Sequence, residues 1–316
     1  MDAVAVERQI RRPRFRRASE PPAFRLTDDD VEIVRQVARF RFIRSTHIAA
    51  LVRRSVDRTN DRLLRLFHAG YIDRPRAQLD YYPTAGSAPI TYALADRGAR
   101  LLRERDGIKV ANPEVSRKNR EAGRPFIEHQ IEIVNFQVAL HRAVRNHPGV
   151  RVISPIEINA ASRQPVPASR NPFALRAKVA HRGVRREISV VPDIVFGLEL
   201  ADGSRRYFMV EIDRGTMPIV RSRFDQTSFE KKMRAYLTAH AAKQHERQFG
   251  LKNFRMLTVT TDRERMQSMK KALRQLRVPR SLGASLFLFA TFEDLRASDP
   301  LTNEWQDGDS RQVRLV

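Results

Sequence analysis

A hairpin signal in the second half of the chain is the strongest constraint on its fold. Asp202-Gly203 separates two runs of residues suited to strands, 188–200 and 207–212. An Asp-Gly pair favours the tight turn that joins two antiparallel strands. The sequence therefore predicts a β-hairpin whose turn covers residues 201–204.

Three carboxylates lie at the open end of this predicted hairpin. Asp193 follows Pro192, and Glu211 and Asp213 end the second run. Side chains alternate along a strand, so Glu211 and Asp213 share a face while Ile212 turns into the core. Pairing around the turn brings Asp193 beside Glu211. Such carboxylates suit Mg²⁺ or Mn²⁺, although ordinary strand-end acids facing water would give the same pattern.

Length and composition limit the class of protein. A chain of 316 residues is long enough for two domains. It has no apolar run of about 18 residues, so we expect no membrane span. Its arginine-rich start lacks the apolar segment of a secretory signal. The chain has no cysteine, which excludes disulfides and thiolate metal sites and is compatible with a cytoplasmic location.

The charge indicates a polyanionic partner. Lys and Arg number 59 against 36 Asp and Glu, a formal net charge of +23. An arginine-rich genome would exchange Lys for Arg without creating such an excess over acids. The excess therefore predicts DNA as the main partner. A second copy of the chain and the replication or transfer machinery are further candidate partners.

The first third of the chain predicts a small helical domain. Residues 1–25 are basic and without a sustained period, which indicates a disordered arm. Thr27 precedes three aspartates and is expected to cap the first helix. Two more helices, two short strands at 71–73 and 90–94 and a closing helix complete a domain over residues 26–108.

This order of elements, with the phrases at 69–74 and 90–102, resembles the winged helix-turn-helix family. The resemblance implies that the third helix enters the major groove of DNA. The residues it implies at the interface are Arg54, Arg58, Asn60 and Arg62 around the helix, and Arg74 and Arg76 in the wing. Arg58 and Asn60 are the candidates for reading bases. Asp57 and Asp61 favour the alternative, a winged helix that contacts only protein.

A polar segment, 109–124, is the predicted linker to a second domain over residues 125–316. That domain is expected to begin with a long buried helix, 126–146, followed by a strand at 150–158. We predict a surface loop or irregular hairpin at 159–186, which has seven Lys or Arg and no acid. Its candidate phosphate contacts are Arg163, Arg170, Arg176, Lys178, Arg185 and Arg186.

The rest of the second domain is predicted to alternate helices and strands. A long helix at 227–248 is followed by a strand at 254–260, a helix at 263–276 and a strand at 286–290. The order of elements resembles the PD-(D/E)XK nuclease fold, a mixed-sheet domain. The predicted fold class is therefore α+β and α/β.

In this resemblance, Asp193 and Glu211 correspond to the two acidic motif positions. The lysine of the third position is replaced by Asp213. In that superfamily the lysine can move to the following helix, where this chain has Lys231 and Lys232.

A larger part of the chain resembles the replication-relaxation family of bacterial plasmid and mobile-element proteins. The resemblance rests on residues 129–135, Pro192-Asp193, 211–216 and 232–236. It implies DNA processing during plasmid replication or transfer and does not establish a reaction.

As a nuclease, the chain would hold Mg²⁺ or Mn²⁺ on Asp193 and Glu211, with Glu132 as a further oxygen ligand. Lys232 would orient the attacking water or stabilise developing charge, and Asp213 completes the predicted catalytic set. Arg214 would pair with Asp213 or bind a phosphate.

Two further residues of the predicted site have alternative roles. His129 is either a buried hydrogen-bonded histidine or a base. Tyr236, with Tyr81 and Tyr82, is a candidate nucleophile, although the chain has no His-x-His motif for a histidine-rich relaxase site. The competing prediction is a non-catalytic DNA-binding accessory factor or regulator with a degenerate nuclease fold.

Overall fold

The computed structural model describes residues 14–21, 23–78, 88–107, 115–162, 171–181, 184–223, 225–276 and 284–316. The chain forms two compact units, Met1–Val134 and Asn135–Val316. The fold is α+β, as the sequence predicts, with a seven-stranded mixed sheet in the second unit. The division falls within a long helix, α6 (Arg124–Asn146), later in the chain than the linker predicted at 109–124.

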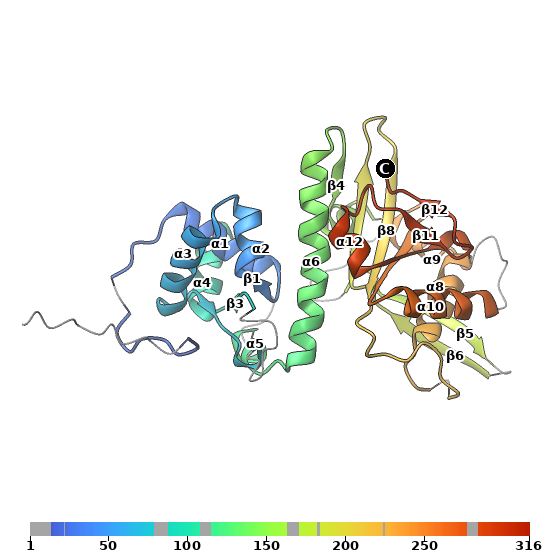
Figure 1. Cartoon of the computed structure of the whole chain (residues 1–316), viewed down its shortest axis with the longest axis horizontal. Coiled ribbons are helices and arrows are strands. Elements are labelled where there is room, and N and C mark those ends of the chain that lie inside the picture. Colours follow the sequence, from blue (N-terminus) through green and yellow to red (C-terminus); the bar gives the residue numbers. More distant parts are fainter. Residues whose placement is uncertain are drawn as a thin grey trace, which may run out of the picture. The chain divides into compact units, whose positions relative to one another are not determined.

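The first unit consists of helices and a small antiparallel sheet. Its helices are α1 (Asp28–Arg39), α2 (Ser45–Val52), α3 (Val56–His68), α4 (Asp96–Asp106) and α5 (Val115–Arg120), with a 3₁₀ turn at Arg76–Gln78. Its strands β1 (Ile43–Arg44), β2 (Ile72–Asp73) and β3 (Thr91–Leu94) pair in the order β1-β3-β2. The predicted helices and strands occur in the predicted order, whereas β1 and α5, the latter within the predicted linker, were not predicted (Figure 1).

Capping residues set where the first helices begin. The Thr27 side chain accepts a hydrogen bond from the Asp30 backbone, and the Asp30 side chain caps Thr27 in return. Ser55 caps α3 through the Arg58 backbone N–H. These bonds satisfy backbone donors that the first turn leaves unpaired. The predicted start of α1 at Thr27 is confirmed.

Part of the arm expected to be disordered is held against the first unit. Arg17 donates to the carbonyl oxygens of Phe67 at 2.8 Å and Ile72 at 3.0 Å, and it pairs with the buried Asp73. The Ala18 backbone N–H donates to the His68 ring at 3.0 Å. These bonds hold Arg17 and Ala18 in place, whereas residues 1–13 lie outside the described part of the chain.

The second unit is built on a sheet with strand order β12-β11-β10-β9-β8-β7-β4. The strands are β4 (Arg151–Ile153), β7 (Ile194–Glu199), β8 (Arg205–Ile212), β9 (Arg255–Thr260), β10 (Phe287–Thr291), β11 (Trp305–Asp307) and β12 (Gln312–Val313). Strands β8, β9 and β10 run parallel, and the other neighbouring pairs are antiparallel.

The predicted central hairpin is confirmed as β7 and β8, but the run predicted for its first strand, 188–200, is divided, because residues 188–190 end a separate strand and β7 begins at Ile194. The register pairs Ile194 with Val210 and Glu199 with Arg205. The turn contains Gly203 at φ +77°, a left-handed conformation that costs glycine little. Because the turn fixes the register, it also fixes which residues meet at the other end of the hairpin.

Two predicted elements are each divided in the structure. The strand predicted over 150–158 is correct only for β4, because Ser154 and Glu157 form a capping box that starts α7 (Pro155–Ala160). The helix predicted over 227–248 is divided into α8 (Phe229–Ala241) and α9 (Gln244–Phe249). Lys243 has a φ of 52°, which a continuous helix cannot contain.

The basic segment predicted as a loop or irregular hairpin contains a regular hairpin. Strands β5 (Leu175–His181) and β6 (Val184–Val190) pair antiparallel over their full length. Leu175, Ala177 and Val179 are buried in the same cluster as residues of α8, whereas Arg176 and Lys178 are exposed. Alternate burial therefore turns the basic side chains of β5 to solvent.

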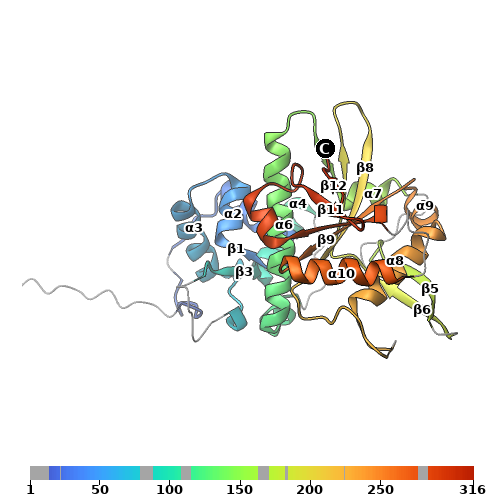
Figure 2. The same ribbon diagram turned by 45° about the vertical axis from the view of Figure 1, so that its right-hand side comes forward.

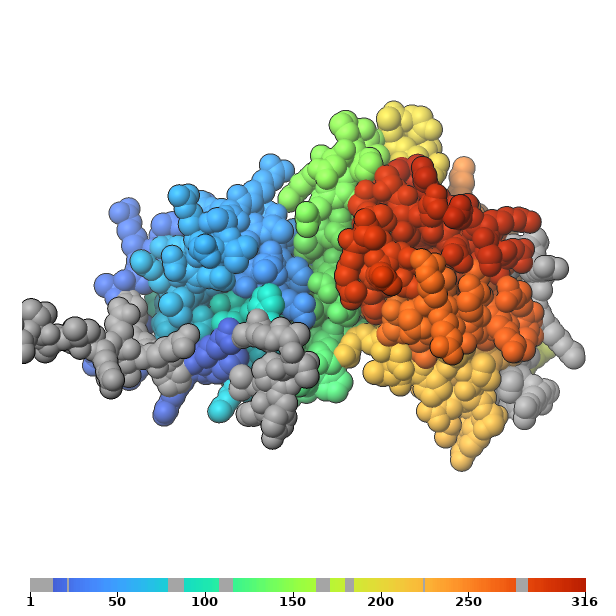
Figure 3. All heavy atoms as spheres, in the orientation of Figure 1, coloured from blue at the N-terminus to red at the C-terminus, as the bar shows by residue number. Residues whose placement is uncertain are grey.

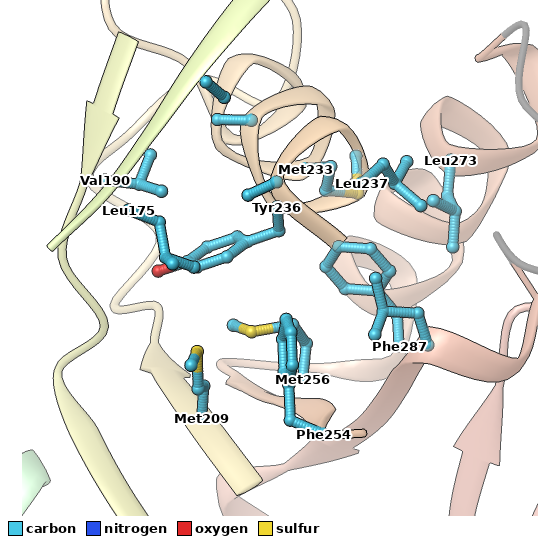
Figure 4. Close-up of a cluster of buried hydrophobic side chains, with 14 of the residues drawn as sticks. Leu175, Val190, Met209, Met233, Tyr236, Leu237, Phe254, Met256, Leu273 and Phe287 are labelled. Carbon is cyan, nitrogen blue, oxygen red and sulfur yellow. The ribbon is translucent and has the colours of Figure 1, made fainter. Parts of the chain in front are cut away.

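Helices cover both faces of the large sheet. On one face, α8 and α10 (Arg263–Gln275) pack over the sheet (Figures 1 and 2). Figure 3 shows the atoms of α10 and of the segments after it together on the surface of the second unit. Figure 4 shows the buried cluster there, with Tyr236 reaching from α8 toward the β5–β6 hairpin. On the other face, Phe136 of α6 contacts Phe196 and Trp305, with ring centroids 6.1 and 6.5 Å away.

The remaining helix of the second unit is α12 (Phe292–Ala297), which follows β10 directly. Thr291 caps it through a capping box with Asp294. None of the helices within the described ranges combines the length and the apolarity that crossing a membrane requires.

Candidate active site

The start of β7 lies beside the end of β8, and this brings two of the predicted carboxylates together. The Asp193 backbone N–H donates to the Val210 carbonyl at 2.9 Å, which extends the hairpin register by one residue. Asp193 Oδ2 then accepts a hydrogen bond from the Ile212 backbone N–H at 2.8 Å. Asp193 is therefore fixed next to Glu211, as the sequence predicts.

Glu211 is held from the other side by α8. Lys232 Nζ lies 2.6 Å from Glu211 Oε2, and the Tyr236 hydroxyl donates to Oε1 at 2.6 Å. The two donors are four residues apart, so they share one face of the helix. Only 3% of the Glu211 side chain is exposed, against 27% of Lys232. The carboxylate is thus buried, while the ammonium group keeps contact with solvent.

Burial governs the protonation of this cluster. Burial raises the pKa of Glu211, and the nearby Asp193 charge adds to the increase. Burial by itself would lower the pKa of Lys232, but the Glu211 carboxylate outweighs it and raises the pKa overall. Burial also raises the pKa of Tyr236 well above its usual value. Lys232 therefore keeps its positive charge and Tyr236 its proton at neutral pH.

Asp213 has the same orientation as Glu211 but a different set of partners. Arg265 of α10 holds it with two bonds, Nε to Oδ2 at 2.5 Å and Nη2 to Oδ1 at 2.9 Å. The Thr260 hydroxyl donates to Oδ2 at 2.7 Å. From the sequence, the next residue, Arg214, was predicted either to pair with Asp213 or to bind a phosphate. The structure gives Arg265 that role, and Arg265 also binds the Met217 carbonyl.

Asp193 and Glu211 are the carboxylates of this cluster that could hold a divalent cation. Each Glu211 oxygen accepts one hydrogen bond and retains a second lone pair. The fully buried hydroxyl of Thr258 has no hydrogen-bond partner among the described residues. It is paired with Glu211 in the β8–β9 register, which adds a third oxygen on that face. Mg²⁺ bound by one or two carboxylates completes its shell with water.

The described residues contain no group of three or more His, Cys, Asp or Glu side chains that could hold a metal. Any cation here would therefore depend on Asp193 and Glu211. Glu132 and His129, also predicted at the site, lie on the part of α6 that belongs to the first unit. Their roles, like the metal itself, stay predictions.

Three of the four residues predicted to contact DNA around α3 are exposed, and one of these three, Arg54, is in an ion pair. Arg58 and Asn60 are both open to solvent. Arg54 pairs with Asp29, and the half-buried Arg62 pairs with the fully buried Asp30, with Nε to Oδ1 at 2.7 Å. Arg62 therefore ties α3 to α1, whereas Arg58 and Asn60 present their side chains to solvent.

The prediction of a phosphate contact at Arg74 conflicts with its burial. Only 8% of the residue is exposed, and its guanidinium lies 4.3 Å from the Phe67 ring centroid. It donates to the Arg14 carbonyl at 2.7 Å and the Tyr92 hydroxyl at 3.2 Å. Burial lowers the pKa of Arg74. Arg74 thus holds the described part of the arm.

The other predicted phosphate contacts divide into two groups. The exposed ones are Arg76, Arg176, Lys178, Arg185 and Arg186. Arg163 and Arg170, and the tyrosines at 81 and 82, lie outside the described residues. Sequence reasoning missed Arg265, Thr258 and Thr260 at the site. The alternation of residues 256–260 could have placed the two threonines on the Glu211 face once β9 was paired with β8.

Comparison with protein families decides which family the chain represents. Residues 34–254, well over half of the chain, match the replication-relaxation family. The chain belongs to the replication-relaxation family. Comparisons with curated proteins and with solved structures give no match. The match spans α3, the β7–β8 hairpin and α8, so it includes Asp193, Glu211 and Lys232. Membership of the replication-relaxation family points to a role in plasmid or mobile-element replication.

Proposed function

We propose that this member of the replication-relaxation family is a DNA-binding protein of plasmid or mobile-element replication or transfer, and that its second unit nicks DNA with Mg²⁺ or Mn²⁺. Family membership supports the biological role. The net charge of +23 supports a nucleic-acid partner, because a surface this basic attracts phosphate.

The contact between Lys232 and Glu211 is the observation that carries the catalytic proposal. A hairpin supplies adjacent acids, and the following helix supplies a lysine whose Nζ is 2.6 Å from one of them. Two acids and a lysine from these elements are the groups that the PD-(D/E)XK resemblance requires. Asp213 occupies the third motif position, where the lysine usually stands, so α8 would supply the lysine in this chain.

Each residue has a distinct role in this proposal. Asp193 and Glu211 would hold the cation, which would polarise the scissile phosphate and lower the pKa of an attacking water. The Lys232 ammonium would stabilise negative charge that develops on the phosphate. Tyr236 would position Glu211 through its hydroxyl. Arg265 would keep Asp213 neutralised, so that it does not repel the DNA backbone.

The first unit would bind DNA. Its three helices followed by strands β2 and β3 support a winged helix-turn-helix, with α3 as the reading helix. Arg58 and Asn60 are exposed on α3, and arginine and asparagine make bidentate contacts with guanine and adenine.

A second candidate function is DNA binding without catalysis, as an accessory factor or regulator. The hydrogen bonds at the carboxylates favour it. Both oxygens of Glu211 already accept hydrogen bonds from Lys232 and Tyr236, and Asp213 is held by Arg265 and Thr260. A buried ion pair of this kind can act as a structural element alone.

Nicking of supercoiled plasmid distinguishes the two candidates. The protein is incubated with plasmid and Mg²⁺ or Mn²⁺, with and without EDTA. The proposal predicts open-circular product that EDTA abolishes. Asp193→Asn should lose this activity and keep DNA binding, and Lys232→Ala should slow nicking and keep metal binding.

Asp202→Asn is the matched control, because Asp202 is an exposed acid in the turn of the same hairpin. It should nick like wild type. Nicking that survives Asp193→Asn, or wild-type protein that binds DNA and leaves it intact with either metal, would contradict catalysis and favour the accessory function.

A further inference from the structure

The β5–β6 hairpin has one face in the core of the second unit and the other face in solvent. The register pairs Leu175 with Val190 and Ala177 with Ile188, and these side chains pack in the buried cluster. Figure 4 shows Leu175 and Val190 beside Tyr236 of α8. Because side chains alternate along a strand, the residues between them point away from α8.

The residues that point away from α8 are polar, and we term them the outer face. They are exposed, and by the register they comprise Arg176, Lys178, Arg185, Glu187 and Ser189. Three of the five are cations and one is an acid, so the outer face is positively charged. Arg186 is paired with Val179 and lies on the opposite face of the hairpin.

The cations of the outer face are not neutralised by the rest of the described chain. The exposed side chains of Arg176, Lys178 and Arg185 form no ion pair or hydrogen bond with the residues that the structure describes. By contrast, the exposed Arg223 of the same unit pairs with Asp225 at 2.9 Å. The outer face therefore keeps its charge for a ligand.

Helix α9 fixes the base of the hairpin. Gln244 Oε1 accepts a hydrogen bond from the Arg176 backbone N–H at 3.1 Å. Gln248 Nε2 donates to the carbonyl oxygens of Pro172 at 2.8 Å and Ala174 at 3.3 Å. The outer face is thus held in one orientation before a ligand binds, which lowers the entropic cost of binding.

The dimensions of the hairpin match the major groove of B-DNA. Paired strands lie about 4.8 Å apart, and the major groove, about 12 Å wide, admits a two-stranded β-ribbon. Arg176 and Ala180, the residue paired with Arg185, are four residues apart. The outer face therefore spans about 13 Å at roughly 3.3 Å per residue, or about four base pairs at 3.4 Å each.

We propose that the outer face of the β5–β6 hairpin lies in the major groove of duplex DNA. Arginine and lysine donate to guanine O6 and N7, glutamate accepts from cytosine N4, and serine contacts either kind of base edge. The acid favours the groove over phosphates alone, because a phosphate repels Glu187 whereas the cytosine amino group donates to it. The inference rests on the proposed DNA binding and adds a second element that contacts DNA, besides α3.

The cysteine-free sequence allows a direct test, because a single introduced thiol is the only one in the chain. Lys178→Cys is mixed with a duplex whose tether ends in a mixed disulfide, so that thiol–disulfide exchange links the two. The tether is placed on cytosine N4, in the major groove, or on guanine N2, in the minor groove. We expect the major-groove tether to cross-link at least fivefold faster. The control Lys271→Cys, exposed on α10, should cross-link to neither tether.

A binding measurement tests the charge of the outer face. Arg176→Gln/Lys178→Gln/Arg185→Gln should weaken binding of a labelled duplex at least tenfold, measured by anisotropy of the full chain in EDTA so that no nicking occurs.

The matched control is Arg247→Gln/Lys271→Gln/Arg296→Gln, which removes the same charges from exposed positions of α9, α10 and α12. It should bind within threefold of wild type.

The outcomes separate this inference from the proposed function. If wild type binds DNA but Lys178→Cys cross-links to neither tether, or to both equally, the major-groove contact is wrong and the proposed function stands. Equal losses in the two triple variants would overturn the inference in the same way. Wild-type protein that binds no DNA would contradict the proposed function and the inference together.

Discussion

The ion pair between Lys232 and Glu211 makes a quantitative prediction about stability. Lys232→Met removes the ammonium and keeps most of the aliphatic stem, so Glu211 stays buried with Tyr236 as its remaining donor from α8. Glu211→Gln removes the opposite charge and keeps the shape. The double variant removes both charges, and the four proteins form a double-mutant cycle.

The structure sets the expected magnitudes. Removing one partner of a buried ion pair costs about 3–5 kcal/mol, because the other charge is left uncompensated. Only 3% of the Glu211 side chain is exposed, so Lys232→Met should cost about 3 kcal/mol of unfolding free energy. Lys232 is 27% exposed and can be hydrated, so Glu211→Gln should cost about 1–2 kcal/mol. The coupling should be about 2 kcal/mol.

The single tryptophan of the chain provides the assay. Trp305 is fully buried on β11, so its fluorescence reports unfolding of the second unit. With a urea slope of about 2 kcal/mol per molar, a loss of 3 kcal/mol lowers the midpoint by about 1.5 M. Additive losses, with a coupling below about 0.5 kcal/mol, would show that the two side chains do not interact in solution and would refute this account of the site.

Three other predictions test separate parts of the account. Tyr236→Phe removes a hydroxyl donor from a buried carboxylate and should cost about 1.5–3 kcal/mol by Trp305 fluorescence. As a control, Tyr207→Phe at a half-buried ring should cost less than about 0.5 kcal/mol. If Tyr236→Phe and Tyr207→Phe cost the same unfolding free energy, the hydrogen bond from Tyr236 to Glu211 is contradicted. Arg58→Ala should lose about 1–3 kcal/mol of binding at the preferred DNA sequence and little on random DNA; equal losses would show that α3 is not the reader. If about six phosphates are neutralised, log K should fall with log salt at a slope of about −5, whereas a slope near zero would contradict DNA binding.

Local signals in the sequence account for the part of the site that was predicted correctly. The Asp-Gly turn sets the hairpin register, and the register alone brings Asp193 next to Glu211. The PD-(D/E)XK resemblance predicted Lys232 near Asp193 and Glu211, and Lys232 contacts Glu211 in the structure. Both inferences depend on short separations along the chain or on a known order of motifs.

The rest of the site depends on packing that no local pattern reveals. Arg265 reaches Asp213 from 52 residues later in the chain, because α10 packs over the same face as α8. Arg74 follows β2 in the predicted wing segment, and only its burial against Phe67 shows that it is not open to a phosphate. The break after α8 occurs at Lys243 in a left-handed conformation, for which lysine gives no sequence signal. The capping box at Ser154 was readable in the sequence and was missed.

Calorimetric titration with Mn²⁺ tests the central claim most directly, because it needs no knowledge of the DNA target. The account predicts that one Mn²⁺ binds per chain, that Asp193→Asn abolishes this binding, and that Lys232→Ala and the control Asp202→Asn retain it. Wild-type protein that takes up no Mn²⁺, or uptake that persists unchanged in Asp193→Asn, would contradict a metal site at Asp193 and Glu211.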